Sequence, residues 1–290
     1  MKSHVASHGN PALSKFNPLP RIISYDDFDD GVCGWTQLVG NYEETLDNIR
    51  NSDDTRAPML SSIPMFDIGS HGAMDGTYSL KIATRGQPGH FAYAVKRMTW
   101  QRLGVIQLEA FITYTVEASR LTLGDEDLRA FTIQMDLQDG YEDRGRRAIP
   151  SIRYHNSQEG ELRRVWQTRS KYMRPKVRTG PSDKASAGST HALRADEFED
   201  IPDAYQPLCY NEVATKINWH YVRWLVDLDG LLSLEFQCND RVYDLRGYPP
   251  VSGEAESNLS NLLNLAFAVE ADADRRCFFY VDSVLLSAED

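Results

Sequence analysis

Side chains that can donate, accept or transfer protons alternate with apolar side chains along several segments of the sequence. In residues 130–137, Gln134 and Asp136 fall on the face opposite Ile133 and Met135, because successive side chains of a strand point to opposite sides. If the similar segments share one sheet, one face of it collects Gln134, Asp136, Arg153, His155, Tyr221, Arg223, Glu235, Gln237 and Asn264.

One interpretation of this face is carbohydrate binding. Amide, carboxylate and guanidinium groups supply the paired donors and acceptors that sugar hydroxyl groups need. Aromatic rings such as those of Trp166 and Tyr221 can stack on the C–H side of a pyranose. The solvated outer face of an ordinary antiparallel sheet would also be polar, so the pattern alone leaves both interpretations open.

The same face also contains groups that could catalyse a reaction on a sugar, either glycoside cleavage or acid–base chemistry. Asp136, His155 or Glu235 would be the general acid or base, and Arg153 and Arg223 would hold the substrate. The sequence contains no phosphate-binding loop, dinucleotide fingerprint or serine nucleophile elbow, so we expect no nucleotide cofactor.

A second candidate for ligand binding lies in residues 90–97. Alternation of side chains predicts that Phe91, Tyr93 and Val95 enter the core. His90 and Lys96 would then lie on the other face, where the small alanines between them leave room for a ligand.

The elements that position these side chains are predicted to be strands. Short segments rich in Val, Ile, Phe, Tyr and Trp follow one another with Gly, Asp or Asn between them, and no segment shows a sustained helical period with caps. Asp229-Gly230 is the clearest hairpin turn, because apolar residues alternate on both sides of it. The sequence therefore predicts an all-β fold, an antiparallel β-sandwich of the jelly-roll type.

The predicted domain organisation is simple. Residues 1–20 contain Pro11, Pro18 and Pro20 and little periodicity, which indicates an N-terminal arm before a single domain over residues 21–290. Two connections, about 40–65 and 170–216, are too long to be turns and are predicted to be loop insertions. A structural protein that assembles into a homo-oligomer through these long segments is a third functional hypothesis.

Composition argues against several classes of partner. With 42 acidic and 31 basic residues the net charge is -11, which would repel nucleic acid and anionic membrane surfaces, so neither is an expected partner. The first ten residues contain no apolar stretch of the kind found in signal peptides, which predicts a cytoplasmic protein. The cysteines are scattered without a CxxC pair and are predicted to be reduced thiols: Cys33, Cys209, Cys238 and Cys277.

Residues 26–31, 69–82 and 280–284 resemble the concanavalin A-like lectin and glucanase domains and the jelly-roll carbohydrate-binding modules. In such domains, acids and backbone oxygens near both chain ends often hold a structural calcium ion, which takes oxygen ligands. The residues that the resemblance implies as calcium ligands are Asp27 or Asp29, Asp75 or Gly76 through backbone oxygen, and Asp282.

The glycosidase members of this class carry acids in alternation on one buried strand, as in Glu-x-Asp-x-x-Glu. This sequence has no such strand, which disfavours retaining hydrolysis by that mechanism. Recognition of a mono- or oligosaccharide without turnover is therefore preferred over catalysis.

Overall fold

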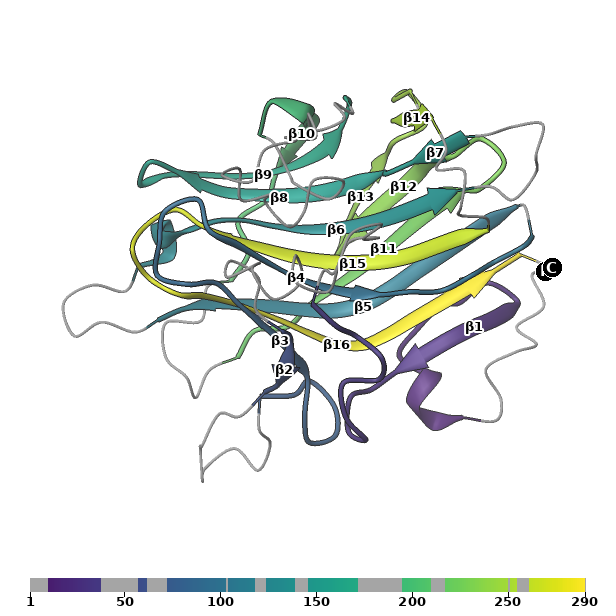
Figure 1. The fold of residues 1–290 in the computed structure, drawn as a ribbon, viewed down its shortest axis with the longest axis horizontal. Helices are drawn as coiled ribbons and strands as arrows, with labels where there is room; N and C mark the ends of the chain where they lie inside the picture. Colours follow the sequence, from purple (N-terminus) through teal and green to yellow (C-terminus); the bar gives the residue numbers. More distant parts are fainter. Residues whose placement is uncertain are drawn as a thin grey trace, which may run out of the picture.

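The computed structural model describes residues 10–37, 57–61, 72–102, 104–117, 124–138, 146–171, 195–209, 217–249, 251–254 and 261–289. Within these residues, strands form two antiparallel sheets that enclose a common apolar core (Figure 1), which confirms the predicted all-β sandwich. Helical structure in the same ranges is limited to the 3-10 turns η1 (Pro11–Leu13), η2 (Asp125–Asp127) and η3 (Ala195–Glu197). No helix in this part of the chain is long and apolar enough to cross a membrane.

The first sheet, sheet A, has the strand order β13-β12-β11-β5-β16-β3-β2. The last strand, β16, pairs with β5 along one side and with both β3 and β1 along the other. The strands of sheet A are β1 (Arg21–Asp26), β2 (Met59–Leu60), β3 (Leu80–Ala83), β5 (Val105–Val116), β11 (His220–Asp227), β12 (Leu232–Cys238), β13 (Arg241–Asp244) and β16 (Cys277–Ala288).

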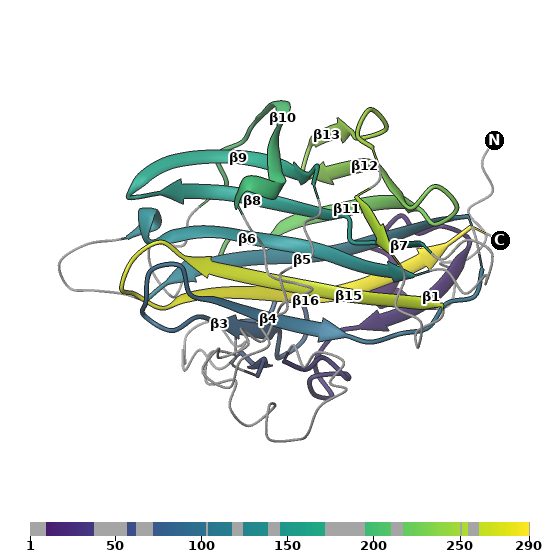
Figure 2. The ribbon, with the colours of Figure 1, turned by 45° about the horizontal axis from the view of Figure 1, so that its top comes forward.

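The second sheet, sheet B, has the order β10-β9-β8-β6-β15-β4, and the short β7 and β14 extend it beside β6. Figure 2 shows β9, β8, β6, β15 and β4 in this order across the molecule. The strands of sheet B are β4 (Phe91–Lys96), β6 (Leu128–Gln138), β7 (Arg146–Ala148), β8 (Ser151–Gln158), β9 (Glu161–Arg169), β10 (Phe198–Tyr205), β14 (Ser252–Glu254) and β15 (Leu262–Ala271).

The core between the sheets contains many aromatic rings. Phe131 of sheet B stacks on Phe279 of sheet A with 4.7 Å between ring centroids, and Tyr154 stacks on Phe131 at 5.1 Å. Burial of such rings is a large part of the stabilising free energy of a sandwich. Because successive side chains of a strand point to opposite sides, the residues that face the core also determine which residues line each outer face.

The described part of the N-terminal arm packs against its own domain. Leu13 and Phe16 form a small apolar cluster with Leu285 on the outer face of sheet A. The Glu109 carboxylate accepts a hydrogen bond from the backbone N–H of Asn17 at 2.9 Å. Residues 10–20 therefore cover part of the outer face of sheet A.

The predicted insertion over residues 170–216 contains a strand that the sequence did not indicate. Residues 198–205 form the edge strand β10, which pairs with β9, and Glu197 just before it is buried. Acidic residues and a proline concealed this strand in the sequence, because both are depleted in strands. Residues 172–194 and 210–216 lie outside the described residues, as does most of the insertion at 40–65, of which residues 59–60 form β2.

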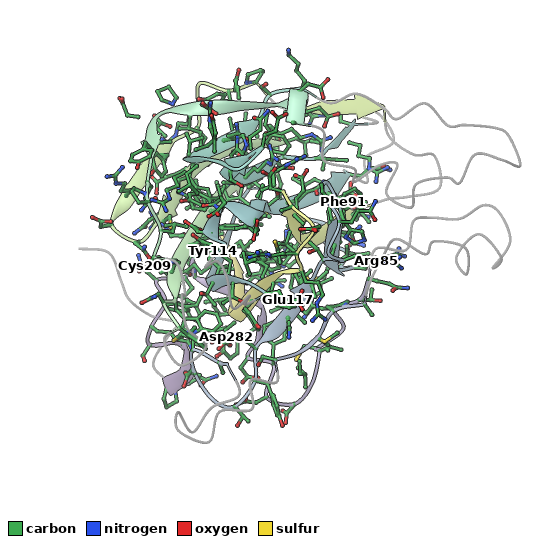
Figure 3. The ribbon with its side chains drawn as sticks, turned by 90° about the vertical axis from the view of Figure 1, so that its left-hand side faces the viewer. Arg85, Phe91, Tyr114, Glu117, Cys209 and Asp282 are labelled. Atoms are coloured by element: carbon green, nitrogen blue, oxygen red, sulfur yellow. The ribbon has the colours of Figure 1, made fainter. Side chains whose placement is uncertain are left out.

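A set of hydrogen bonds made by Asp282 joins the last strand to the segment before β3; we call it the clasp. The Asp282 Oδ2 atom accepts from the backbone N–H groups of Met74 at 2.6 Å and Asp75 at 3.2 Å. The Lys15 ammonium lies 2.7 Å from both the Asp75 carboxylate and the Ser283 hydroxyl. Asp282, which lies on β16 of sheet A, is labelled in Figure 3.

Asp29 makes a second, similar connection to the same segment. Its Oδ1 atom accepts from the N–H groups of Thr77 at 2.6 Å and Tyr78 at 3.0 Å, while Asp27 accepts from the N–H of Asp29. Amide and ammonium groups thus contact carboxylate oxygens of Asp27, Asp29, Asp75 and Asp282, four of the five predicted calcium ligands. Among the described residues no group of three or more His, Cys, Asp or Glu is arranged for a metal, so calcium binding at the clasp stays a prediction.

Candidate functional site

The predicted polar face is divided between the two sheets. β6, β8 and β15 are neighbours in sheet B, whereas β11 and β12 lie in sheet A. The expectation of a single face is therefore wrong, because alternation assigns a side chain to one side of its strand but does not assign the strand to a sheet. Sheet B carries Gln134, Asp136, Arg153, His155 and Asn264, and sheet A carries Tyr221, Arg223, Glu235 and Gln237.

We call the outer side of β4, β15, β6, β8 and β9 the polar face of sheet B. The strand register places Gln134 between Ala266 and Ser151, and Thr132 between Ala268 and Arg153. Small side chains thus alternate with long polar ones across adjacent strands. The side chains of this face are Tyr93, Val95, Ala130, Thr132, Gln134, Asp136, Ser151, Arg153, His155, Gln167, Asn264, Ala266, Ala268 and Glu270.

Positive and negative charges are paired on this face and at its margin. The Asp136 carboxylate receives both a 2.8 Å and a 2.7 Å hydrogen bond from one guanidinium group, a bidentate geometry. The pairs are Asp136 with Arg147, Glu270 with Arg153 at 2.9 Å and with Arg129 at 3.2 Å, and Glu197 with Arg169. Arg129 also contacts Asp272 at 2.6 Å, so the four guanidinium groups are matched by four carboxylates.

Several buried polar atoms of the same face have no hydrogen-bond partner among the described residues. They are both amide atoms of Gln134, the Nε atom of Arg153 and the Nδ1 atom of His155. The Gln134 side chain belongs to a residue that is 1% exposed. Leaving such an amide unsatisfied costs roughly 1–3 kcal/mol, which is a reason to look for a ligand at this position.

The imidazole of His155 is held neutral by its surroundings. Burial, followed by the nearby charges of Arg153 and Arg163, lowers the pKa of His155 from 6.5 to about 4. At neutral pH the imidazole therefore has one donor and one acceptor nitrogen. The side chain already makes a hydrogen bond with the Ser157 backbone, and Nδ1 is its buried atom without a partner among the described residues.

The proposed catalytic groups do not come together. His155 lies opposite Ala130 on β6, six positions from Asp136 along that strand, or about 20 Å. Glu235 lies in the other sheet, where it pairs with Arg223. Since general acid–base chemistry needs its groups within hydrogen-bond reach of one substrate, these residues do not form a shared catalytic centre.

Trp166 lies in the core and is not on a ligand-binding face, which corrects its predicted role. It is 0% exposed, and its indole N–H donates to the Gln206 side chain at 2.8 Å. Its ring lies 4.6 Å from that of Phe236, across the sandwich. The strand β9 turns this residue inward, so no sugar could stack on it.

The two faces of β4 are the reverse of the prediction. Its alanines face the core, while Phe91, Tyr93 and Val95 lie on the polar face of sheet B with Ala266 and Ala268. Figure 3 labels Phe91 at the start of this strand. Both faces of β4 are apolar, so the size of its side chains was a poor guide to which face is buried in the core. The space between the sheets at β4 is filled by small alanines.

Lys96 and His90 consequently do not form a ligand site together. Lys96 points to the inner side and forms an ion pair with the Asp26 carboxylate at 2.6 Å. The same carboxylate accepts a hydrogen bond from the Trp35 indole N–H. His90 precedes β4, is buried, and accepts the backbone N–H of Arg85 through Nδ1 at 3.2 Å.

The polar residues on the outer side of sheet A are engaged with neighbouring groups. The Tyr221 hydroxyl donates to Glu109 at 2.6 Å, close to the N-terminal arm. The Gln237 amide donates to the backbone oxygen of Asn239 at 2.7 Å, and Arg223 contacts Glu235. This half of the predicted face thus forms a hydrogen-bonded surface of the scaffold.

Three residues at the polar face of sheet B were missed from the sequence. Glu270 continues the alternation that begins at Asn264 and could have been found by extending that segment by one residue. The size of Tyr93 predicts a position in the core, whereas its ring lies on the polar face. Arg147 lies in a strand of three residues, which is too short for any periodic signal.

Solved structures that resemble this chain include lectin domains and a carbohydrate-binding module, the class that the sequence also resembles. The carbohydrate recognition domain of Emp47p is 9% identical, with 88% of this chain and 95% of that chain covered and a TM-score of 0.39. The CBM2 module of the evolved Dit of Lactobacillus casei BL23 phage J-1 is 10% identical, with 93% of this chain and 96% of that chain covered and a TM-score of 0.43. Winged bean acidic lectin complexed with methyl-α-D-galactose is 8% identical, with 92% of this chain and 99% of that chain covered and a TM-score of 0.41.

Likeness at this level carries no argument about a ligand of this chain. No curated protein matches the chain. One family model covers almost all of it, over residues 3–290. The chain therefore belongs to the DUF6772 family, whose description is a domain of unknown function.

Proposed function

We propose that this protein binds a carbohydrate on the polar face of sheet B, without turning it over. The observation that carries the proposal is the side chain of Gln134, whose amide is buried and has no partner in the described part of the chain. A carboxamide donates and accepts side by side, which matches a pair of adjacent sugar hydroxyl groups. The bound hydroxyls would relieve the cost of the unsatisfied amide.

The neighbouring side chains suit the same ligand. Ala266 lies beside Gln134 in the register, and Ala268 beside Thr132, so backbone and small side chains can approach a flat ring closely. Tyr93 supplies an aromatic side chain on the same face. The charged groups at the face are paired with one another, which favours binding by hydrogen bonds over binding by net charge.

Replacing Gln134 with methionine, which has a similar shape, tests the proposal. We expect glycan affinity to fall about tenfold or more, because the hydrogen bonds to the ligand are lost, while the free energy of unfolding rises by about 1 kcal/mol. A glycan array with the labelled protein, followed by calorimetry on the best ligand, measures the first effect, and urea unfolding measures the second.

Gln237→Met is the matched control, because this amide lies on the other sheet and already has a partner. It should leave glycan binding unchanged and lower stability slightly. Unchanged binding in Gln134→Met, or no binding to any glycan by the unmodified protein, would contradict the proposal.

The pH dependence of binding is a second test. Because the pKa of His155 is lowered to about 4, the imidazole stays neutral and affinity should be constant between about pH 5 and 8. Below that range, protonation would add a charge next to Arg153 and weaken binding. A titration midpoint near the ordinary histidine value of 6.5, abolished by His155→Asn, would show that His155 is not held neutral.

The oligomer hypothesis remains a prediction with its own test. Removal of residues 172–194 leaves β9 and β10 intact, unlike a deletion that includes the strand. If the insertion mediates assembly, sedimentation velocity of the shortened protein should show a smaller species. Location in the cytoplasm also stays a prediction.

A further inference from the structure

The buried atoms without a hydrogen-bond partner on the polar face of sheet B belong to three residues that lie in successive rows along the direction of β8. Gln134 lies opposite Ser151, while Arg153 and His155 are the next outward residues along β8. Each step along the strand between outward side chains is two residues, so the rows of Gln134 and His155 are about 13 Å apart. The Nε atom of Arg153 lies in the row between them.

This spacing bears on the size of the ligand. A span of about 13 Å exceeds the width of one pyranose ring, so a monosaccharide that contacts Gln134 could not also reach His155. The three side chains belong to residues that are 1%, 2% and 6% exposed, so each loses solvent hydrogen bonds. A single ligand that supplied partners for all three would therefore have to extend along β8.

The charges around the line bear on the kind of sugar. The Arg153 guanidinium already contacts Glu270 at 2.9 Å and the Gln167 amide oxygen at 3.2 Å, which leaves only Nε unpartnered. Arg169 and Arg147 are each paired with a buried carboxylate. A carboxylated or sulfated sugar would add an anion to a face whose cations are compensated, and its desolvation would then be unfavourable.

We propose that the polar face of sheet B binds an uncharged linear oligosaccharide of more than one unit, lying parallel to β8 from Gln134 to His155. This rests on the proposed carbohydrate binding and specifies its ligand class. Gln134 contacts the first unit, Arg153 Nε donates to a hydroxyl or ring oxygen midway, and His155 Nδ1 exchanges a hydrogen bond with a later unit.

Calorimetry with gluco-, manno- and galacto-oligosaccharides of increasing length, from the monosaccharide to the tetrasaccharide, tests this ligand class, with the matching oligouronates as the charged arm. We expect affinity to rise tenfold or more from the monosaccharide to the trisaccharide in at least one neutral series. The uronates should bind at least tenfold more weakly than their neutral counterparts. Equal affinity for mono- and trisaccharide, or tighter binding of the uronates, would overturn the inference.

Two substitutions at His155 separate contact from folding. His155→Ala should remove the gain in affinity from the later units, whereas His155→Asn, which keeps a polar atom near the position of Nδ1, should restore part of the gain. A gain that survives in both variants contradicts the line of contacts. If no member of any series binds, the proposed function itself fails, and this inference with it.

Discussion

Replacing Trp166 with alanine is expected to lower the free energy of unfolding by about 3–5 kcal/mol, the usual range for a fully buried tryptophan. The ring contacts Tyr154 at 5.0 Å and Phe236 at 4.6 Å between centroids, so its removal opens a cavity between the two sheets. The loss also leaves the Gln206 side chain without its indole donor. Guanidinium unfolding followed by circular dichroism measures the change.

Trp100→Ala is the control for this substitution, because Trp100 is partly exposed and contacts the Arg21 side chain at 5.1 Å. It should cost much less stability. Trp166→Phe keeps most of the buried volume and should bind glycans as the unmodified protein does. A phenylalanine variant that is stable but binds no glycan would restore the stacking role that the sequence suggested.

The second large effect concerns the clasp. Burial raises the pKa of Asp282 from 3.8 to about 6, against the lowering influence of the Asp75 and Met74 amides. The folded protein therefore binds the Asp282 proton more tightly than the unfolded chain does. This contribution to stability is fully present below about pH 4 and is lost as the pH rises through about 6.

Asp282→Asn removes this titration. Relative to the variant, the unmodified protein should lose about 3 kcal/mol of unfolding free energy between about pH 4 and 7. Urea unfolding across that range measures the difference. Asp75→Asn is the control of opposite sign, because Lys15 lowers the pKa of Asp75, so that its stabilising contribution is present at neutral pH and is lost on acidification.

The same experiment tests the calcium prediction. An ion bound by Asp282 would keep the carboxylate charged, so millimolar calcium would abolish the pH difference and raise stability at neutral pH. If calcium and chelator give identical unfolding curves, amide groups and Lys15 are sufficient to hold the clasp.

Most strands and their inward faces could be predicted because alternation is a local property, and β10 and the faces of β4 are the exceptions. The inward Ile133 and Met135 of β6, and the inward Trp224 and Val226 of β11, follow directly from their sequence positions. The outward sides of the same strands were also correct. What could not be predicted is that β11 joins β5 in one sheet while β8 joins β6 in the other.

The assignment of strands to sheets decides which of the predicted site residues lie on the same face. Pairing between β5 and β11 joins residues separated by more than 100 positions, for which one sequence carries no local signal. Gln134 was selected for its polar outward position, but its lack of a partner depends on neighbours from β8 and β15. The distance between His155 and Asp136 likewise depends on the register between β6 and β8. This register places the two side chains too far apart to act on one substrate.

The position of β16 at the centre of sheet A has a consequence for biosynthesis. β1, β3 and one side of β5 pair with a strand that is synthesised after every other described strand of the two sheets. The backbone N–H and C=O groups that face β16 stay unpaired until that strand is made, an arrangement that favours slow folding and capture by chaperones. A nascent chain arrested before Cys277 should therefore be protease-sensitive in sheet A, however much of sheet B has already formed.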